Sequence, residues 1–326
     1  MTRRAGVLLI AAAIVAALAA PVLAPHAPDA RDRSLLNAPP TWPHFVADDG
    51  SWHAPFIYRW RIVSRLEQSY EQDRSARIPL AFFSSGHLLQ SSNEADAPLF
   101  LLGADSFGRD VLSRLLYGAR ISLGLAAVAA LGATLIGAAV GGLAGYRGGA
   151  VDDLLMRATD FVMVLPAMYV ALALRAVLPL VLTPRQVFTL LAAIFAALGA
   201  PFIARGVRAI VRSERQLDYA AAAEALGASG WRLLGRHLLP AARGFIVVQI
   251  TVLVPAFIVA EATLSYVGLG FPEPVASWGT MLHDAATNIR VFADFPWLLS
   301  PAAAMFIVVL GLNLVLQEEK GLGARG

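Results

Sequence analysis

The sequence predicts an all-α membrane protein with six transmembrane helices. Hydrophobic residues make up 57% of the 326 residues, and the mean hydropathy is +0.63. A helix needs about 20 apolar residues to cross the hydrocarbon core of a bilayer, and six runs reach or approach this length. These runs are residues 6–23, 121–146, 161–182, 187–204, 244–270 and 296–316.

Composition also argues against several kinds of site. The sequence pI is about 9.5, but the basic residues are interleaved with membrane spans, so we expect no nucleic-acid partner. Cysteine is absent, which excludes disulfides and thiolate metal sites. The six histidines fit no close metal-ligand pattern, and Lys320 does not follow a glycine-rich phosphate-binding turn. We therefore expect a chain that is not an enzyme and binds no cofactor or metal itself.

Residues 1–25 are predicted to form an N-terminal transmembrane anchor. Arg3 and Arg4 precede the apolar run, and Ala17-Leu18-Ala19 resembles a signal-peptide cleavage site. A cleaved signal peptide is therefore the alternative. The apolar core is longer than the usual core of a signal peptide, which favours the uncleaved anchor.

The distribution of basic residues predicts which loops lie in the cytoplasm. Nearly all arginines of the short loops fall on the side of the N-terminus, and the short loops of the other side contain only Arg185 and Arg290. Because short cytoplasmic loops carry an excess of Arg and Lys, both termini and residues 213–240 are expected inside. The predicted parts are then a loosely folded extracytoplasmic insertion at 26–100, a transmembrane domain at 101–316 and a cytoplasmic tail at 317–326.

The segment from Asp218 to Pro240 resembles a polar helix-turn-helix between two apolar runs. Asp218 can cap the first helix, and Gly227 suits the left-handed residue that ends it. Ser229 can begin a second helix that ends at Pro240. We expect this second helix to bury its leucines, which are Leu233, Leu234, Leu238 and Leu239.

Two surfaces of this hairpin suit insertion into the groove of a partner protein. The first helix presents small residues, and the second presents Arg232 and Arg236 at i,i+4 spacing. From the residues alone, the alternative is an amphipathic hairpin that lies on the lipid surface.

Two features of the apolar runs are unusual. Glu261 lies deep in the fifth run, where a carboxylate is costly unless it faces a cavity or has a partner. We expect either a pathway or gating residue, together with Ser265 one turn later, or a structural carboxylate bonded to neighbouring helices. Gly137, Gly141 and Gly145 form a stripe on the second run that permits close helix contact, and packing within the chain is favoured over a subunit interface.

Four motifs occur in the same order as in a known family. They are Gly103 to Arg120, Ala223 to Pro240, Glu261 to Gly270, and Ser277 to Leu282. Through them, residues 100–315 resemble the second permease subunit of the dipeptide and oligopeptide ATP-binding-cassette importers, a group that includes nickel permeases. The resemblance implies a type I importer (MetI-like) core with six spans, which forms half of a heterodimeric pore.

The resemblance also implies partners and a substrate. The partners would be a homologous permease, two cytoplasmic ATPase subunits that hold ATP and Mg²⁺, an extracytoplasmic solute-binding protein, and the lipid of a bacterial inner membrane. The substrate would be a di- or oligopeptide, with nickel or another small solute as the alternative. A stand-alone secondary transporter, driven by an ion gradient with Glu261 as proton carrier, is the competing class.

Within this family, the hairpin is expected to contact the ATPase subunits. The residues assigned to this contact are Ala221, Ala222, Ala223, Glu224, Leu226, Gly227, Ala228, Ser229, Arg232, Arg236 and Pro240. The family usually has an acidic or polar residue at the position of Ala221, whereas Glu224 lies about one helical turn later. Residues 317–326 also differ from the usual C-terminal pattern of the family.

Overall fold

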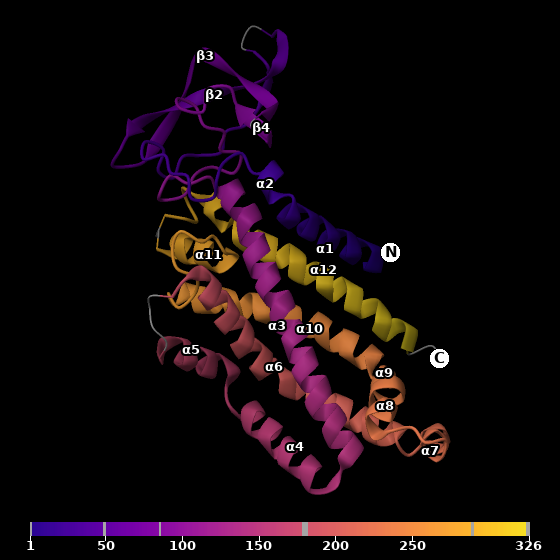
Figure 1. Cartoon of the computed structure of the whole chain (residues 1–326). Helices are drawn as coiled ribbons and strands as arrows, with labels where there is room; N and C mark the ends of the chain where they lie inside the picture. Colours follow the sequence, from indigo (N-terminus) through magenta and orange to yellow (C-terminus); the bar gives the residue numbers. More distant parts are fainter. Residues whose placement is uncertain (1, 48–49, 85, 178–181, 288–289, 324–326) are drawn as a thin grey trace. The chain divides into compact units, whose positions relative to one another are not determined.

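The computed structural model describes residues 2–47, 50–84, 86–177, 182–287 and 290–323 (Figure 1). The chain divides into two compact units. The first, called here the helical unit, contains residues 1–6, 123–264 and 312–326. The second, called here the mixed unit, contains residues 7–122 and 265–311 and includes the β-strands.

Long apolar helices form most of the helical unit. They are α3 (Val111–Arg147), whose greater part lies in this unit, α4 (Gly149–Val164), α5 (Ala167–Val177), α6 (Pro184–Glu214) and α10 (Arg243–Tyr266) (Figure 1). The start of α6 is defined by a capping box, in which Thr183 and Gln186 satisfy each other's backbone N–H groups. Pro184 follows at the first helical position, where its missing N–H costs nothing.

A row of glycines brings α3 and α6 into backbone contact. The facing pairs are Gly137 with Ala200, Gly141 with Ala204, and Gly145 with Arg208. A Cβ atom on Gly141 would lie only 2.9 Å from the Cα atom of Ala204, so the backbones leave no space for a side chain there. The predicted glycine stripe is therefore confirmed as a packing surface within the chain.

The third apolar run is not a single straight helix, contrary to our prediction for residues 161–182. It contains the end of α4 and all of α5, and these two helices meet at an angle of 89°. Leu165 has an extended backbone (φ −71°, ψ 131°), because Pro166 follows it and disfavours the helical conformation of the preceding residue. Residues 178–181 of the run lie outside the described residues.

Ion pairs hold α4 against α6. Arg208 donates to both carboxylate oxygens of Asp152, each at 2.5 Å, and the Asp152 side chain is only 4% exposed. Arg212 approaches the same carboxylate at 3.4 Å, and Arg205 lies 3.2 Å from Asp160. A bidentate pair of arginine and carboxylate is stronger and more specific in geometry than a single hydrogen bond, so it fixes the contact between the two helices.

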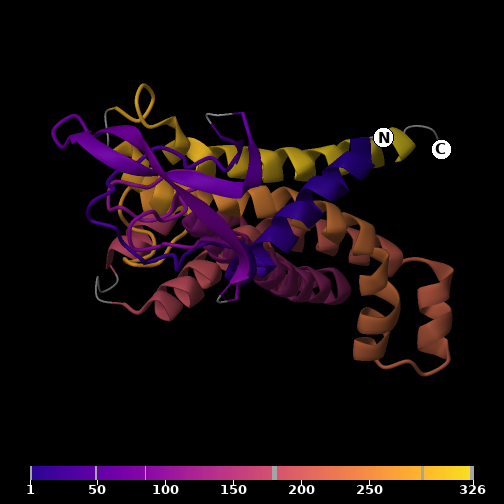
Figure 2. The ribbon, with the colours of Figure 1, turned by 90° about the horizontal axis from the view of Figure 1, so that it is seen from above.

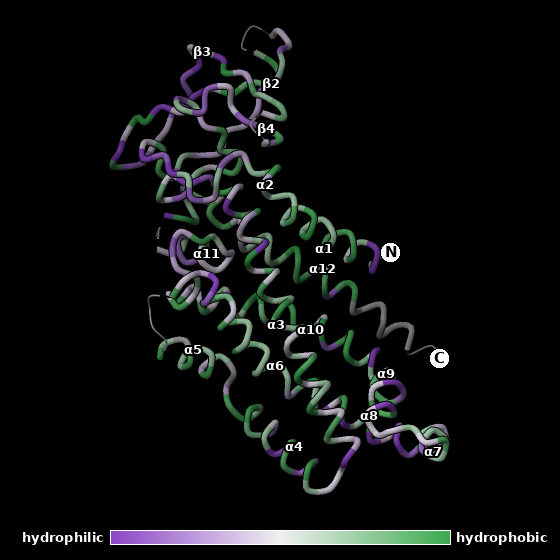
Figure 3. Tube along the Cα trace, viewed as in Figure 1, coloured by the Kyte–Doolittle hydropathy of each residue, from purple (hydrophilic) through white to green (hydrophobic). Residues whose placement is uncertain are grey.

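The predicted number of six spans is not confirmed. Among the described residues, four helices are long and apolar enough to cross a membrane: α3, α6, α10, and the helix at Pro296–Val315 that includes most of α12 (Ser300–Gly323). The bent pair α4 and α5 would make five. The helix of the predicted N-terminal anchor, α1 (Thr2–Leu18), has 17 residues and is mainly hydrophobic along its length (Figure 3). This length lies at the lower limit for a span.

The insertion is folded as a β-sheet, which corrects two predictions: that the chain is all-α and that residues 26–100 are loosely folded. Four antiparallel strands follow one another in sequence order: β1 (His44–Val46), β2 (Trp52–Ser64), β3 (Ser69–Ser84) and β4 (His87–Ser91). Figure 2 shows the long strands β2 and β3 side by side. Ile57, Leu80 and Leu99 pack in one of its buried clusters.

Proline, aspartate and serine are frequent in residues 26–100, and these residues favour an irregular chain. Residues 56–63 are instead rich in the aromatic and β-branched side chains that favour strands. Phe56, Ile57 and Tyr58 are all buried, so the strand lacks the simple alternation of a sheet with one solvated face. A strand of this kind gives only a weak period-2 signal in the sequence.

Tryptophan side chains and a second capping box order the rest of the mixed unit. Ser277 and Thr280 form the capping box that starts α11 (Trp278–Ala286). Trp278 donates from its backbone N–H to Ser122 Oγ and from its indole N–H to the carbonyl oxygen of Leu115, both at 3.1 Å. Trp297, in the short helix η2 (Pro296–Leu299), donates to the carbonyl oxygen of Ala104 at 3.0 Å.

The seam between α3 and α6 can be tested with a matched pair of glycine substitutions. Gly141→Ala should destabilise the protein by about 1–3 kcal/mol, because the new methyl group overlaps the Ala204 backbone. Gly124→Ala, also in α3, should be neutral or slightly stabilising, since nothing lies within 4 Å of its Cβ position. Thermal unfolding of the two purified variants in detergent measures the difference, and equal melting temperatures would argue against the seam.

Candidate functional site

The predicted helix-turn-helix is present in the helical unit. Its first helix is α7 (Asp218–Ala225), and Gly227 follows with a φ of +86°. The Gly227 N–H bonds to the Glu224 carbonyl at 2.9 Å, and the Ala228 N–H bonds to the Ala223 carbonyl at 3.0 Å. These two bonds form a Schellman motif, and the prediction that Gly227 ends the helix in the left-handed conformation is confirmed.

The second arm of the hairpin consists of three short pieces: α8 (Gly230–Leu233), the π-helix η1 (Leu234–Leu238) and α9 (Leu239–Ala241). Ser229 has the extended backbone of an N-cap residue, as predicted, although its side chain makes no capping bond. Leu233, Leu234 and Leu238 are buried, whereas Leu239 is half-buried.

Two predicted helix ends are wrong. The N-cap of α7 is Leu217, and Asp218 lies in the first turn, where a carboxylate still favours the positive end of the helix dipole. Pro240 does not end the second arm, since α9 continues to Ala241. A proline has no N–H to donate to the preceding turn, and the chain immediately before α9 is widened into the π-helix.

The second arm packs directly on the end of α3. A Cβ atom on Gly142 of α3 would lie 3.2 Å from Leu239 Cδ2 and 3.5 Å from Leu234 Cδ1. A Cβ atom on Gly230 would lie 2.6 Å from the Tyr146 hydroxyl, so the first residue of α8 touches this ring. Glycines at both positions allow the hairpin and α3 to approach more closely than side chains would permit.

Tyr146 also contacts Arg215, the residue that follows α6. The Arg215 guanidinium donates to the Tyr146 carbonyl oxygen and lies 4.6 Å from the centre of the Tyr146 ring. Beside this contact, Tyr146, Trp231 and Leu234 line part of a cavity of about 220 Å³. Tyr146 thus joins the end of α6, the end of α3 and the second arm of the hairpin.

The free surface of the hairpin is apolar at its turn and basic on its second arm. Leu226 is 90% exposed and Trp231 is 74% exposed. Among the predicted contact residues, Ala223, Ala228 and Pro240 are half-buried. The exposed ones are Ala221, Ala222, Glu224, Leu226, Gly227, Ser229, Arg232 and Arg236. Exposed tryptophan beside arginine is typical of the centre of a protein interface.

Glu261 and Ser265 lie one turn apart on α10, and both are buried, with exposures of 0% and 2%. Glu261 takes part in a hydrogen-bonding or electrostatic interaction, as a buried carboxylate requires. Its burial fits both roles considered for this residue, the gating residue and the structural carboxylate.

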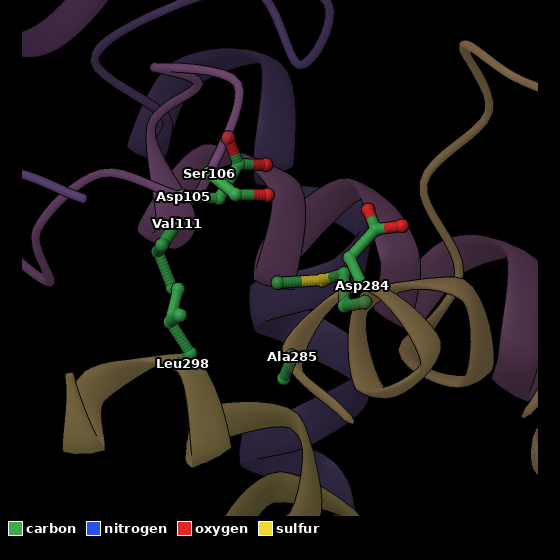
Figure 4. Close-up of a pocket in the computed structure, with 7 residues that line it drawn as sticks. Asp105, Ser106, Val111, Asp284, Ala285 and Leu298 are labelled. Carbon is green, nitrogen blue, oxygen red and sulfur yellow. The ribbon is translucent and has the colours of Figure 1, made fainter. Parts of the chain in front are cut away.

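A buried charge cluster in the mixed unit joins two motifs that are far apart in sequence. Arg109 is fully buried and donates to three carboxylates: Asp105 at 2.6 Å, Glu273 at 2.6 Å and Asp284 at 2.7 Å. Asp105 and Asp284 also line a small cavity of about 10 Å³ together with apolar residues such as Val111 and Leu298 (Figure 4). The cluster ties the segment before α3 to the segment that follows α10.

A second arginine completes this cluster. Arg114 is 1% exposed and lies 3.6 Å from Asp105 and 3.7 Å from Asp284, which are ion-pair distances rather than hydrogen bonds. Burial lowers the pKa of Arg109, but the three carboxylates outweigh this effect and raise its pKa above the usual value. Burial raises the pKa of Asp284, and the two arginines offset only part of that shift.

Our sequence prediction missed this cluster as a site. Asp105, Arg109 and Arg114 were recognised only as part of a family motif, and no role was given to Glu273 or Asp284. The available signal was the spacing of Asp105 and Arg109 at i,i+4 before a helix, but it does not identify partners more than 160 positions away.

A neighbouring histidine of the mixed unit is also charged. His26 Nε2 lies 2.6 Å from Glu94, and Nδ1 lies 3.6 Å from Asp110. Burial lowers the pKa of His26, but these two carboxylates outweigh it and raise the pKa to about 9.

Among the described residues, no group of three or more His, Asp or Glu is arranged to hold a metal ion. The expectation that the chain binds no cofactor stays a prediction.

Comparison with known proteins identifies the family. Residues 133–317 match the family described as binding-protein-dependent transport system inner membrane component. The chain is 39% identical over 214 residues to the oligopeptide transport system permease protein OppC of Bacillus subtilis, a match that covers 65% of this chain and 67% of the relative.

Two further relatives match a similar share of the chain. The dipeptide transport system permease protein DppC of Alkalihalophilus pseudofirmus is 35% identical over 240 residues, which are 73% of this chain and 76% of the relative. The glutathione transport system permease protein GsiD of Pectobacterium atrosepticum is 34% identical over 223 residues, 68% of this chain and 71% of the relative. The resemblance predicted from the four motifs is confirmed, and the chain belongs to the family of inner membrane components of binding-protein-dependent transport systems.

Proposed function

We propose that this chain is the permease subunit of an ATP-driven importer of di- or oligopeptides and forms half of its translocation pore. The substrates of the relatives support this substrate class, since oligopeptides, dipeptides and glutathione all share peptide bonds and a free carboxylate. The observation that supports the coupling role is the hairpin, which exposes Leu226 and Trp231 while its second arm is packed on α3.

The hairpin would dock on a cytoplasmic ATPase subunit. Leu226 and Trp231 supply apolar area for a groove of that subunit, and Arg232 and Arg236 can meet carboxylates at its rim. The hairpin and the adjoining end of α3 would move as one body, because Gly230 touches Tyr146, and Leu234 and Leu239 pack at Gly142. Closure of the ATPases on ATP would then change the access of the pore through a difference in contact free energy between the two states.

The remaining subunits follow from this role. ATP and Mg²⁺ would be held by two ATPase subunits, a homologous permease would complete the pore, and an extracytoplasmic solute-binding protein would deliver the peptide. All of them would assemble in a bacterial inner membrane, with this chain crossing it six times and both termini in the cytoplasm. The placement of arginines in the short loops supports this orientation.

Glu261 would act in the pathway or its gate, with Ser265 beside it on α10. An ionisable residue within a membrane-spanning helix is rare and usually marks a transport pathway, which supports this role for a carboxylate that is 0% exposed.

A substitution at Gly227 tests the coupling role. Gly227→Arg should abolish ATP-driven uptake and association with the ATPase subunits while membrane insertion persists, because arginine is strained at a φ of +86° and adds bulk to the docking surface. Gly227→Asn is the matched control, since asparagine tolerates the left-handed conformation, and it should retain most uptake. Uptake of labelled dipeptide into proteoliposomes and co-purification of the ATPases are the measurements; full activity of the arginine variant would remove the hairpin from this role.

Reporter fusions test the orientation. A periplasm-active reporter fused after residue 60 should be active, and the same reporter fused after residue 230 should be inactive, because the insertion is outside and the hairpin inside. A cytoplasm-active reporter should give the reverse pattern. Equal activity at both positions would contradict the proposed topology.

Glu261→Gln tests the gating role. Glutamine keeps the size and hydrogen-bonding capacity but removes the charge, so uptake should fall at least about tenfold while expression and ATPase association stay normal. Ser265→Ala, which removes only a hydroxyl group, should cause a smaller loss. Wild-type uptake by the glutamine variant would show that Glu261 is structural.

A further inference from the structure

A cavity of about 390 Å³ opens in the mixed unit beside the hairpin of β2 and β3. One wall comes from Arg33, Ser34 and Leu36. The other comes from Ile62, Arg65, Gln68 and Tyr70 of the β2–β3 hairpin. Its volume falls within the range of small-molecule sites, which is roughly 300–1,000 Å³. None of its residues belongs to the buried charge cluster or to the cytoplasmic hairpin.

Two arginines without carboxylate partners stand at this cavity. Arg33 and Arg65 are exposed, and neither has an ion pair within the part of the chain that the structure describes. Two other arginines of this unit are paired: Arg31 lies 3.5 Å from Glu273, and Arg59 lies 3.4 Å from Asp73. A planar guanidinium can bind a carboxylate through two parallel hydrogen bonds, so two of them on one cavity favour an anionic group with this shape.

The polar groups around the cavity are held in place by other residues. Tyr70 donates its hydroxyl hydrogen to the Leu36 carbonyl at 2.5 Å, which joins the two walls. Asn37 Nδ2 donates to Gln68 Oε1 at 2.8 Å, and the backbones of both residues are left-handed, with φ values of 54° and 52°. Non-glycine residues in this conformation carry a conformational cost and persist only where the surroundings fix them.

The turn between β2 and β3 is also held by hydrogen bonds to residues outside the turn. Arg290 donates to the carbonyl oxygen of Glu67 at 3.0 Å, and the Glu67 N–H bonds to Ser64 Oγ at 3.2 Å. The cavity is therefore largely preformed, which lowers the entropic cost of binding.

The remaining groups match the main chain of a short peptide. Leu36 and Ile62 give the cavity an apolar part that suits a small side chain. Ser34 and Gln68 add polar groups to the lining, which can meet the N–H and C=O groups of a peptide main chain. Asp32, next to Arg33 in the sequence, accepts hydrogen bonds from the Ser34 N–H and hydroxyl at 2.8 and 2.6 Å.

We propose that this cavity binds the free carboxylate end of a short peptide through Arg33 and Arg65. The inference rests on the proposed function, because it places a second, low-affinity contact for the imported peptide on the permease itself. A carboxylate on the surface of the solute-binding protein is the competing occupant, and the experiment separates the two.

The test measures binding to the purified permease complex in lipid nanodiscs, without the solute-binding protein. The probes are tri-alanine with a free carboxylate and the same peptide with a C-terminal amide. Wild-type protein should bind the free acid at least about tenfold more tightly than the amide, which corresponds to two exposed ion pairs. The double variant Arg33→Gln with Arg65→Gln should lose this preference.

Arg61→Gln is the matched control. It removes an exposed charge from the same strand pair but lies outside the cavity wall, so it should keep the preference for the free acid. Equal binding of acid and amide by wild-type protein, or an unchanged preference in the double variant, would overturn the inference. Weaker capture of the solute-binding protein by the double variant, with peptide binding unchanged, would also overturn it in favour of a protein interface.

A separate assay keeps this inference distinct from the proposed function. ATP-driven uptake of tri-alanine by the complete importer is measured in proteoliposomes with the solute-binding protein present. If uptake occurs but the binding assay shows no preference for the free carboxylate, only the proposed role of the cavity is contradicted. The absence of uptake for every peptide tested contradicts the peptide importer itself and, with it, the basis of the inference.

Discussion

The close contact between the backbones of α3 and α6 is the constraint on which the helical unit depends. In a membrane, apolar side chains gain little by leaving lipid for another helix, so helices associate through close packing and polar contacts. Gly137, Gly141 and Gly145 provide this packing because no side chain separates α3 from the α6 backbone. The seam fixes the position of the α3 segment that includes Gly142 and Tyr146, and the second arm of the hairpin packs on these two residues.

In the mixed unit, buried ion pairs connect distant segments, whereas glycine packing does so in the helical unit. Arg109 and Arg114 are buried among three carboxylates. The opposite charges offset the free-energy cost of burying the arginines. Breaking such a network by removal of one partner is usually far more destabilising than the net value of the network suggests. The segment before α3 and the segment after α10, both of which match family motifs, are thereby fixed to each other.

The sequence was most informative where a single residue had only one structural solution. Gly227 could be placed because glycine readily adopts the left-handed conformation in which many helices end. The glycine stripe could be placed because its spacing matches one face of a helix. The leucines Leu233, Leu234 and Leu238 are buried as the helical period requires. Contacts between distant segments were not predictable in this way, since the partners of Arg109 at Glu273 and Asp284 have no local pattern. Composition misled the prediction for the insertion, because apolar and polar side chains alternate too little along its buried strands. Hydropathy alone suggested one helix for residues 161–182, but Pro166 breaks this run.

The central claim is that the hairpin and the end of α3 move as one body when the importer binds ATP. The chain contains no cysteine, so a Glu224→Cys and Arg147→Cys pair can be spin-labelled selectively, with both positions exposed. Pulsed electron paramagnetic resonance on the assembled complex then measures the distance between the labels with and without ATP, using a second pair on the ATPases to verify that they close. The account predicts an unchanged distance distribution between hairpin and α3. A shifted or broadened distribution after ATP binding would contradict it.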